Sequence, residues 1–114
     1  MKFLIEIDQV KTAAPPTRQA GREFIEQIIF PTLDCADQLA RAGRIVAGGP
    51  VAGRIALRFI AEADSPQQVD ELVSSLPLWT VAETRVTPLI EFGERRAHVE
   101  ILRQKLAPPG DERP

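Results

Sequence analysis

LRFIAEADSPQQVDELVSSLPLWTVAETRVTPL, residues 57–89, places the strongest helix signal of the chain between two strand-like segments. Ser65 suits the N-cap of that helix, and Pro66 suits its first position, where a missing amide hydrogen does no harm. The flanking segments alternate between apolar and polar residues, which is typical of strands. This part of the sequence therefore predicts a helix between one strand over residues 54–61 and another over residues 76–89.

Upstream of this stretch, the chain begins with the alternation of a strand that is buried on one side. Over residues 2–10 one face is apolar and the other is mixed, the two sets being Phe3, Ile5 and Ile7 against Leu4, Glu6 and Asp8. Residues 44–47 and 54–61 flank the sequence GGPVAG, and a glycine-rich connection of this length predicts a β-hairpin.

Residues 18–42 have the apolar spacing of a helix that lies against a core. Pro31 lies inside this range and must bend or break the helix, because proline removes an amide donor and clashes with the preceding turn. We therefore expect two helical pieces that meet near Pro31, with Thr32 or Asp34 capping the second piece. Gly43 suits the left-handed position that ends a helix.

The resulting order of strand, helix, strand, strand, helix, strand is that of a ferredoxin-like β-α-β-β-α-β sandwich, an α+β fold. We expect a four-stranded antiparallel sheet in the order 4-1-3-2, with both helices on one face and the other face bare. Residues 1–90 would form this domain. Residues 91–114 would add a C-terminal helix over residues 94–106, with Val99, Leu102 and Leu106 at helical spacing, and a frayed tail.

The composition excludes several classes of protein. A chain of 114 residues with a formal net charge of -2 lacks the basic excess of a nucleic-acid-binding domain. No apolar run reaches the roughly 20 residues of a membrane-spanning helix, so we expect a cytoplasmic protein with no membrane partner. Cys35 is the only cysteine and His98 the only histidine, which excludes an internal disulfide and a Cys/His zinc site. No metal or other cofactor is predicted.

Charged residues mark the bare face of the predicted sheet. Glu83 and Arg85 lie two residues apart in the last strand, so their side chains point to the same face. In the expected strand order the first strand lies between the third and the fourth, which brings Glu6 beside Arg58 on one side and beside Arg85 or Glu83 on the other. The same face carries the apolar residues Leu4, Ala56, Ile60 and Val81. Apolar surface of this extent calls for a cover, so we expect a homodimer packed through this face.

Several of these segments resemble a known family. LPLW, residues 76–79, followed by a strand with Glu83 and RVTPL, resembles the end of the muconolactone delta-isomerase domain, and FLIEI, residues 3–7, resembles its first strand. The sequence AGGPVAG together with residues 57–79 is similar to the wider group that includes the YCII-like proteins. Both groups are dimeric α+β barrels, and the resemblance implies this architecture. It also shows departures, because Glu6 occupies a position similar to that of a lysine in the isomerase strand, and Leu4 one similar to that of a histidine.

The resemblance implies a small-molecule ligand and a cofactor-independent isomerase that shifts a proton in an unsaturated lactone. One group would remove a proton next to the carbonyl and return it further along, while a cation would stabilise the enolate oxygen. Glu6 or Glu83 would be the base, and Arg58 or Arg85 the electrophilic partner. The same balanced set of charges is also typical of a polar dimer interface, so the alternative is a non-catalytic dimeric accessory or assembly module.

Two further residues are candidates for binding a substrate. Arg54 borders the predicted hairpin and is either a solvated strand end or a clamp for a carboxylate at the mouth of the cavity. Trp79 follows the end of the helix and either packs at the sheet edge or lines a pocket for a planar ligand. A void between the paired sheets would favour the enzyme, and a filled interface would favour the accessory module.

Overall fold

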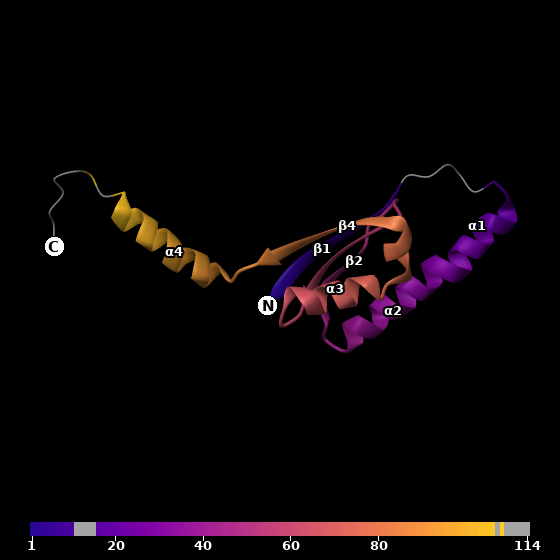
Figure 1. Cartoon of the computed structure of the whole chain (residues 1–114), viewed down its shortest axis with the longest axis horizontal. Coiled ribbons are helices and arrows are strands. Elements are labelled where there is room, and N and C mark those ends of the chain that lie inside the picture. The colour runs from indigo at the N-terminus through magenta and orange to yellow at the C-terminus, as the bar shows by residue number, and fades with distance from the viewer. Residues whose placement is uncertain (11–15, 107, 109–114) are drawn as a thin grey trace.

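The computed structural model describes residues 1–10, 16–106 and 108, and its four strands form one antiparallel sheet in the order β2-β3-β1-β4. Figure 1 shows α2 and α3 on one side of this sheet. The predicted α+β fold and strand order are confirmed. In chain order the elements are β1 (Lys2–Gln9), α1 (Arg18–Phe24), η1 (Ile25–Ile29), α2 (Phe30–Arg41), β2 (Ile45–Pro50), β3 (Ala56–Glu62), α3 (Pro66–Ser74), η2 (Pro77–Val81), β4 (Ala82–Leu89) and α4 (Phe92–Lys105).

The hydrophobic core lies between the sheet and the helices that cover it. Alternate residues of β1 and β3 point into it, and apolar residues of α3 pack against them from the helical layer: Phe3, Ile5, Ile7, Leu57, Phe59, Val69, Leu72 and Val73. Ile5 and Ile7 have no exposed surface. Removing this apolar surface from water is the main source of the stability of the fold.

The first helical segment is continuous, so the predicted break at Pro31 is wrong. α1, η1 and α2 follow one another without a gap, and the amide of Phe30 donates to the carbonyl of Ile25, five residues back. This wider π-helical turn accommodates Pro31, which has no amide hydrogen and needs room for its ring. Neither Thr32 nor Asp34 caps a helix, because α2 begins inside the helical run.

Two glycines shape the chain on either side of β2. Gly43 adopts the predicted left-handed conformation, with a φ of 77°. The amide of Arg44 donates to the carbonyl of Leu39 and closes the end of α2. The hairpin differs from its prediction, since β2 continues through Gly48 to Pro50. Gly48 has a φ of 114° and lies so close to β3 that a Cβ atom would approach the carbonyl oxygen of Arg58 to 2.2 Å.

The path from α3 into the last strand also differs from the prediction. Ser65 caps α3 as expected by accepting a hydrogen bond from the amide of Gln68. The chain then forms the 3₁₀ helix η2, so β4 begins at Ala82, and Val81 is not part of the sheet face. The hydroxyl of Thr32 accepts a hydrogen bond of 2.9 Å from the amide of Leu78, which fixes η2 to α2. Because η2 directly precedes β4, this buried contact also helps to fix the start of the strand.

The C-terminal helix α4 begins two residues earlier than predicted and stands apart from the sheet and from the other helices (Figure 1). Its connection to β4 consists of Ile90 and Glu91. Within the described ranges, α4 and the other helices are all too short or too polar to cross a membrane.

Candidate functional site

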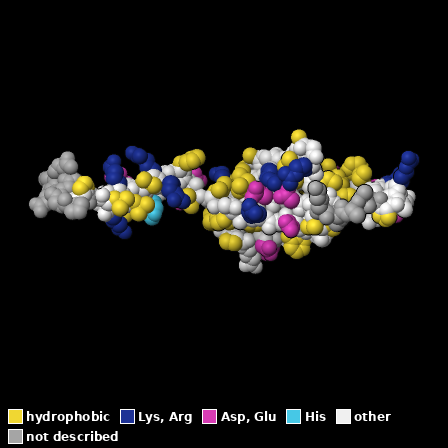
Figure 2. Space-filling view, turned by 90° about the horizontal axis from the view of Figure 1, so that it is seen from above, with side chains coloured by type: hydrophobic (Ala, Val, Ile, Leu, Met, Phe, Trp, Pro, Cys, Tyr) yellow, Lys and Arg dark blue, Asp and Glu magenta, His cyan; other side chains and the backbone are white. Residues whose placement is uncertain are grey.

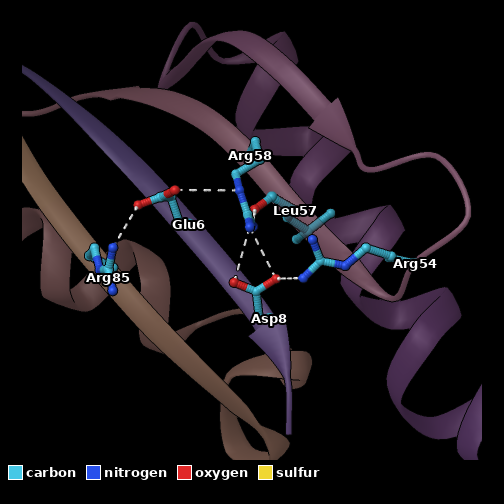
Figure 3. A network of polar contacts seen from close by, with 6 residues as sticks. All are labelled: Glu6, Asp8, Arg54, Leu57, Arg58 and Arg85. Carbon is cyan, nitrogen blue, oxygen red and sulfur yellow. Dashed lines mark hydrogen bonds and ion pairs between the residues drawn. The ribbon is translucent and has the colours of Figure 1, made fainter. Parts of the chain in front are cut away.

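The register of the strands brings charged side chains together on the open face of the sheet, the face that α2 and α3 leave uncovered (Figure 3). Glu6 of β1 lies opposite Arg58 of β3 on one side and Arg85 of β4 on the other. Asp8, two residues further along β1, lies opposite Glu83 of β4. Because residues two apart and directly paired residues share a face, these acids and arginines all project to the same side.

Arg58 is the centre of a polar network in which each of its three guanidinium nitrogens faces an oxygen atom. Its Nη2 lies 3.1 Å from each carboxylate oxygen of Asp8, its Nε 3.5 Å from Glu6 Oε1, and its Nη1 donates to the carbonyl of Leu57 at 2.9 Å. Arg54 donates to the same carboxylate of Asp8 from the turn that precedes β3 (Figure 3). Arg58 therefore bridges the two acids of β1 and is held in place by them.

Glu83 and Arg85 are much less committed. Arg85 Nη1 lies 4.0 Å from Glu6 Oε2, the limit of an ion pair, and its side chain is 79% exposed. Glu83 makes no hydrogen bond or ion pair to any residue that the structure describes. These two side chains are therefore free to meet a ligand, whereas the groups around Arg58 already meet one another.

The charged side chains surround a hollow of about 210 Å³ that is open to solvent on one side. Its lining consists of Glu6, Asp8, Arg58, Glu83, Thr84 and Arg85. Figure 2 shows acidic and basic side chains gathered over the middle of the body, with hydrophobic side chains on either side of them. A hollow of this kind offers hydrogen-bond donors and acceptors to a small polar molecule, and apolar surroundings on which a second molecule can rest.

The candidate residues from the sequence fall into two groups. Glu6, Arg58, Glu83 and Arg85 all line the hollow, and Arg54 reaches its edge through Asp8. Trp79 lies on η2 with 43% of its surface exposed and is not part of the lining. Asp8 is a site residue that the sequence analysis did not select, although its spacing of two from Glu6 on the same strand was the signal that could have identified it.

The two residues that could have supplied other chemistry lie elsewhere. Cys35 is half-buried on α2, where its Sγ faces the carbonyl and hydroxyl of Ser75, and His98 lies on α4. Among the described residues, His, Cys, Asp and Glu side chains form no group of three or more that could hold a metal ion. The chemistry available in the hollow is that of carboxylates and guanidinium groups.

Comparisons with known proteins agree with this architecture. The sequence model of muconolactone delta-isomerase matches residues 1–95. A crystal structure of muconolactone isomerase at 3.3 Å resolution superimposes with a TM-score of 0.65 over 80% of this chain and 90% of that chain, at 20% sequence identity. At this level of identity the likeness shows a shared fold. The search of curated proteins returned no match.

Proposed function

Because this chain belongs to the muconolactone delta-isomerase family, we propose that it is a cofactor-independent isomerase that shifts a proton within an unsaturated lactone, using the hollow on the open face. One observation carries the proposal. Glu83 and Arg85 line the same hollow, come from neighbouring positions of one strand face, and are the least committed charges in it. A carboxylate and a guanidinium group in this relation are what such a reaction needs.

The reaction moves one proton and one double bond. A base takes the proton from one end of a three-carbon unit, the electron pair shifts toward the lactone carbonyl to give a dienolate, and the same proton returns to the other end. Neither an oxidant nor a metal is required for the balance. The protein has to supply a base with a free oxygen atom, a cation beside the enolate oxygen, and shelter from water.

Glu83 fits the role of the base better than Glu6. Glu6 directs Oε1 toward Arg58 at 3.5 Å and Oε2 toward Arg85 at 4.0 Å, so each of its oxygens already faces a cation. Glu83 has no such partner among the described residues, and its carboxylate can therefore approach a C–H bond of the substrate. This difference in contacts supports Glu83 over Glu6 as the proposed base.

Arg85 fits the role of the cation that meets the enolate or the carboxylate of the substrate. Its single ion pair is long, and leaving it costs little. Arg58 is only 33% exposed and is bound on three sides, so we assign it to positioning Glu6 and Asp8. Arg54 would act on the substrate only after releasing Asp8.

We further propose that a second copy of the chain closes the hollow by packing on the open face. Leu4 and Ile60 lie opposite each other on this face, next to the charged residues, and they give it an apolar area that can pair with itself. Closure would exclude water from the hollow and strengthen the interaction of Arg85 with a developing negative charge.

The alternative function is a non-catalytic dimeric module in which the same charges only pair with one another. The observation that favours it is the number of ion pairs already present, since Arg54, Arg58 and Arg85 each face an acid of β1. Such a balanced network fixes the register of an interface without chemistry. The two functions differ in the role of Glu83, which is the base in the isomerase and has no function in the non-catalytic module.

The test is isomerisation of muconolactone followed by NMR in deuterated buffer. We expect wild-type protein to convert the substrate, and Glu83→Gln to lower the rate by about 100-fold or more, because a carboxamide cannot take the proton. Arg85→Ala should lower it by a similar factor through loss of charge stabilisation.

The matched control is Glu71→Gln, the same change at an exposed acid of α3. It should leave the rate unchanged. A wild-type protein that neither isomerises the lactone nor exchanges its carbon-bound protons would contradict the enzyme proposal and favour the module. Full activity in Glu83→Gln together with loss in Glu6→Gln would move the base to Glu6.

A further inference from the structure

The C-terminal helix α4 exposes apolar side chains that its own chain leaves uncovered. Val99, Leu102 and Leu106 follow one another at helical spacing, Phe92 lies seven residues before Val99, and these four form the stripe of α4. Their exposed fractions are 50% for Val99, 42% for Leu102, 80% for Leu106 and 96% for Phe92. A single helix of 14 residues is marginal in water unless it packs on something.

The surface area indicates that a partner is missing. The chain has 8627 Å² of accessible surface, whereas a folded monomer of 12.6 kDa is expected to have about 6,200 Å². The comparison can be repeated with each undescribed residue given the exposure of an unfolded chain, about 160 Å², and the folded-monomer expectation applied to the described residues alone. An excess of about 1,000 Å² then remains. That excess is close to the roughly 800 Å² that each partner buries in a stable interface.

The body of the protein carries an unoccupied apolar groove of the right kind. Two adjoining hollows of about 250 and 170 Å³ run between α2 and the β2–β3 hairpin and share Leu33, Pro50 and Leu57. Leu33 and Ile55 keep 40% and 46% of their surface exposed along it. We call this the α2–β2 groove. An amphipathic helix with apolar side chains at positions i, i+3 and i+7 is a usual occupant of such a groove.

α4 does not lie near this groove on its own chain, because it leaves the end of β4 and extends away from the body (Figure 1). β2 and β4 are opposite edges of the sheet, about 14 Å apart, and α2 and α3 cover the face between them. The connection of Ile90 and Glu91 spans at most about 7 Å. The groove of a second molecule, in contrast, can be approached by α4 in this extended arrangement.

Charge favours the body of a second copy over a second α4. α4 carries four basic and two acidic side chains, so the formal charge of -2 divides into +2 on α4 and -4 on the rest of the chain. Two α4 helices would repel each other, while α4 and the body attract. Asp37 lies on the wall of the groove, where it can meet a basic residue of α4.

We infer that α4 is an exchanged arm, which docks the stripe of Phe92, Val99, Leu102 and Leu106 into the α2–β2 groove of a second copy of this chain. This inference goes beyond the proposed isomerase and is independent of it. The family match ends at residue 95, so most of α4 lies outside the part of the chain that the family shares.

The test is the mass of the full chain by analytical ultracentrifugation over a dilution series, with three variants. Leu102→Glu places a charge in the stripe, and Leu33→Glu places one in the groove. Ile101→Glu is the matched control, because Ile101 is the neighbour of Leu102, is exposed to a similar extent at 51%, and points away from the stripe. Circular dichroism and thermal unfolding check that each variant is folded.

We expect wild-type protein to be oligomeric at micromolar concentration. Leu102→Glu and Leu33→Glu should each raise the dissociation midpoint at least about tenfold, and Ile101→Glu should leave it in place. A monomeric wild-type protein would overturn the inference, and so would a change in Leu102→Glu with none in Leu33→Glu, which would mean that the arm docks elsewhere. Isomerisation is assayed on the same samples, so loss of assembly and loss of activity are read separately.

Discussion

The two faces of the sheet are made by the same strands and differ in almost every other respect. On β1, Phe3, Ile5 and Ile7 point to the covered face and are buried to 1% exposure or less. Glu6 and Asp8, which follow Ile5 and Ile7 in the chain, point to the open face and remain partly exposed. One strand thus serves the core and the candidate site with alternate residues.

The difference indicates which residues hold the fold and which are available for function. Apolar side chains on the covered face contribute about 1.5–3 kcal/mol each when fully buried. Partly exposed ion pairs on the open face contribute about 0–1 kcal/mol each. The open face can therefore hold three acids and three arginines without being needed for folding, and substitutions there should change function more than stability.

The largest expected effect tests this division directly. Ile5→Ala removes a fully buried side chain and should lower the free energy of unfolding by about 3–4 kcal/mol, because it leaves a cavity in the core. Leu4→Ala, the adjacent residue on the open face, should cost about 1 kcal/mol or less in the monomer. Urea unfolding followed by circular dichroism measures both. Equal losses would show that the open face is as much a core as the covered one.

The next effect concerns the glycine that lets β2 approach β3. Gly48→Ala forces a Cβ toward the carbonyl oxygen of Arg58 and the Cα of Phe59, at a φ that side chains rarely adopt. We expect a loss of about 2–4 kcal/mol, with displacement of the Arg58 side chain from the hollow.

Gly49→Ala is the matched control for this prediction, because a Cβ at Gly49 meets no atom within 4 Å. It should change the free energy of unfolding by about 0.5 kcal/mol or less. Chemical denaturation of the two variants, with the isomerisation assay as a second measurement, separates the strain at Gly48 from a general effect of adding a methyl group.

The sequence predicted the features that depend on local patterns. Period-two alternation located β1 and β3, and the Ser65 cap located α3. The order of elements was sufficient for the sheet topology and for placing Glu6 beside Arg58, whereas the register of β4 decided that Arg85, and not Glu83, is its other neighbour. These features follow from side-chain spacing and cap chemistry, which are properties of short segments.

The features that it missed depend on contacts between distant segments. The helix remains continuous at Pro31 because a π-helical turn makes room for the ring, and η2 forms where Leu78 meets Thr32, 46 residues away. Glu6 faces two arginines and Glu83 faces none among the described residues, and this difference depends on the side-chain conformations of Arg58 and Arg85. The spacing of residues in the sequence does not predict those conformations. Strand order makes residues neighbours, but side-chain packing decides which of them are already engaged.

The smallest expected effect concerns the polar exception on the covered face. Thr84 borders the hollow between Glu83 and Arg85, but it lies opposite Ile7 in the register, and its hydroxyl is buried without a hydrogen-bond partner among the described residues. A buried hydroxyl with no partner is destabilising, and valine has nearly the same shape without that group. Thr84→Val should therefore stabilise the protein by about 1 kcal/mol and raise the melting temperature by about 4 °C.

Thr87→Val makes the same change on the other face, since Thr87 lies opposite Leu4. Its hydroxyl is not among the buried groups that lack a partner, so no gain is expected there. Calorimetry of the two variants compares the faces through one chemical substitution. A higher melting temperature for Thr84→Val alone would show that the covered face excludes water as far as β4. Equal melting temperatures for the two variants would mean that water reaches the hydroxyl of Thr84 and that the water-free core ends at β1.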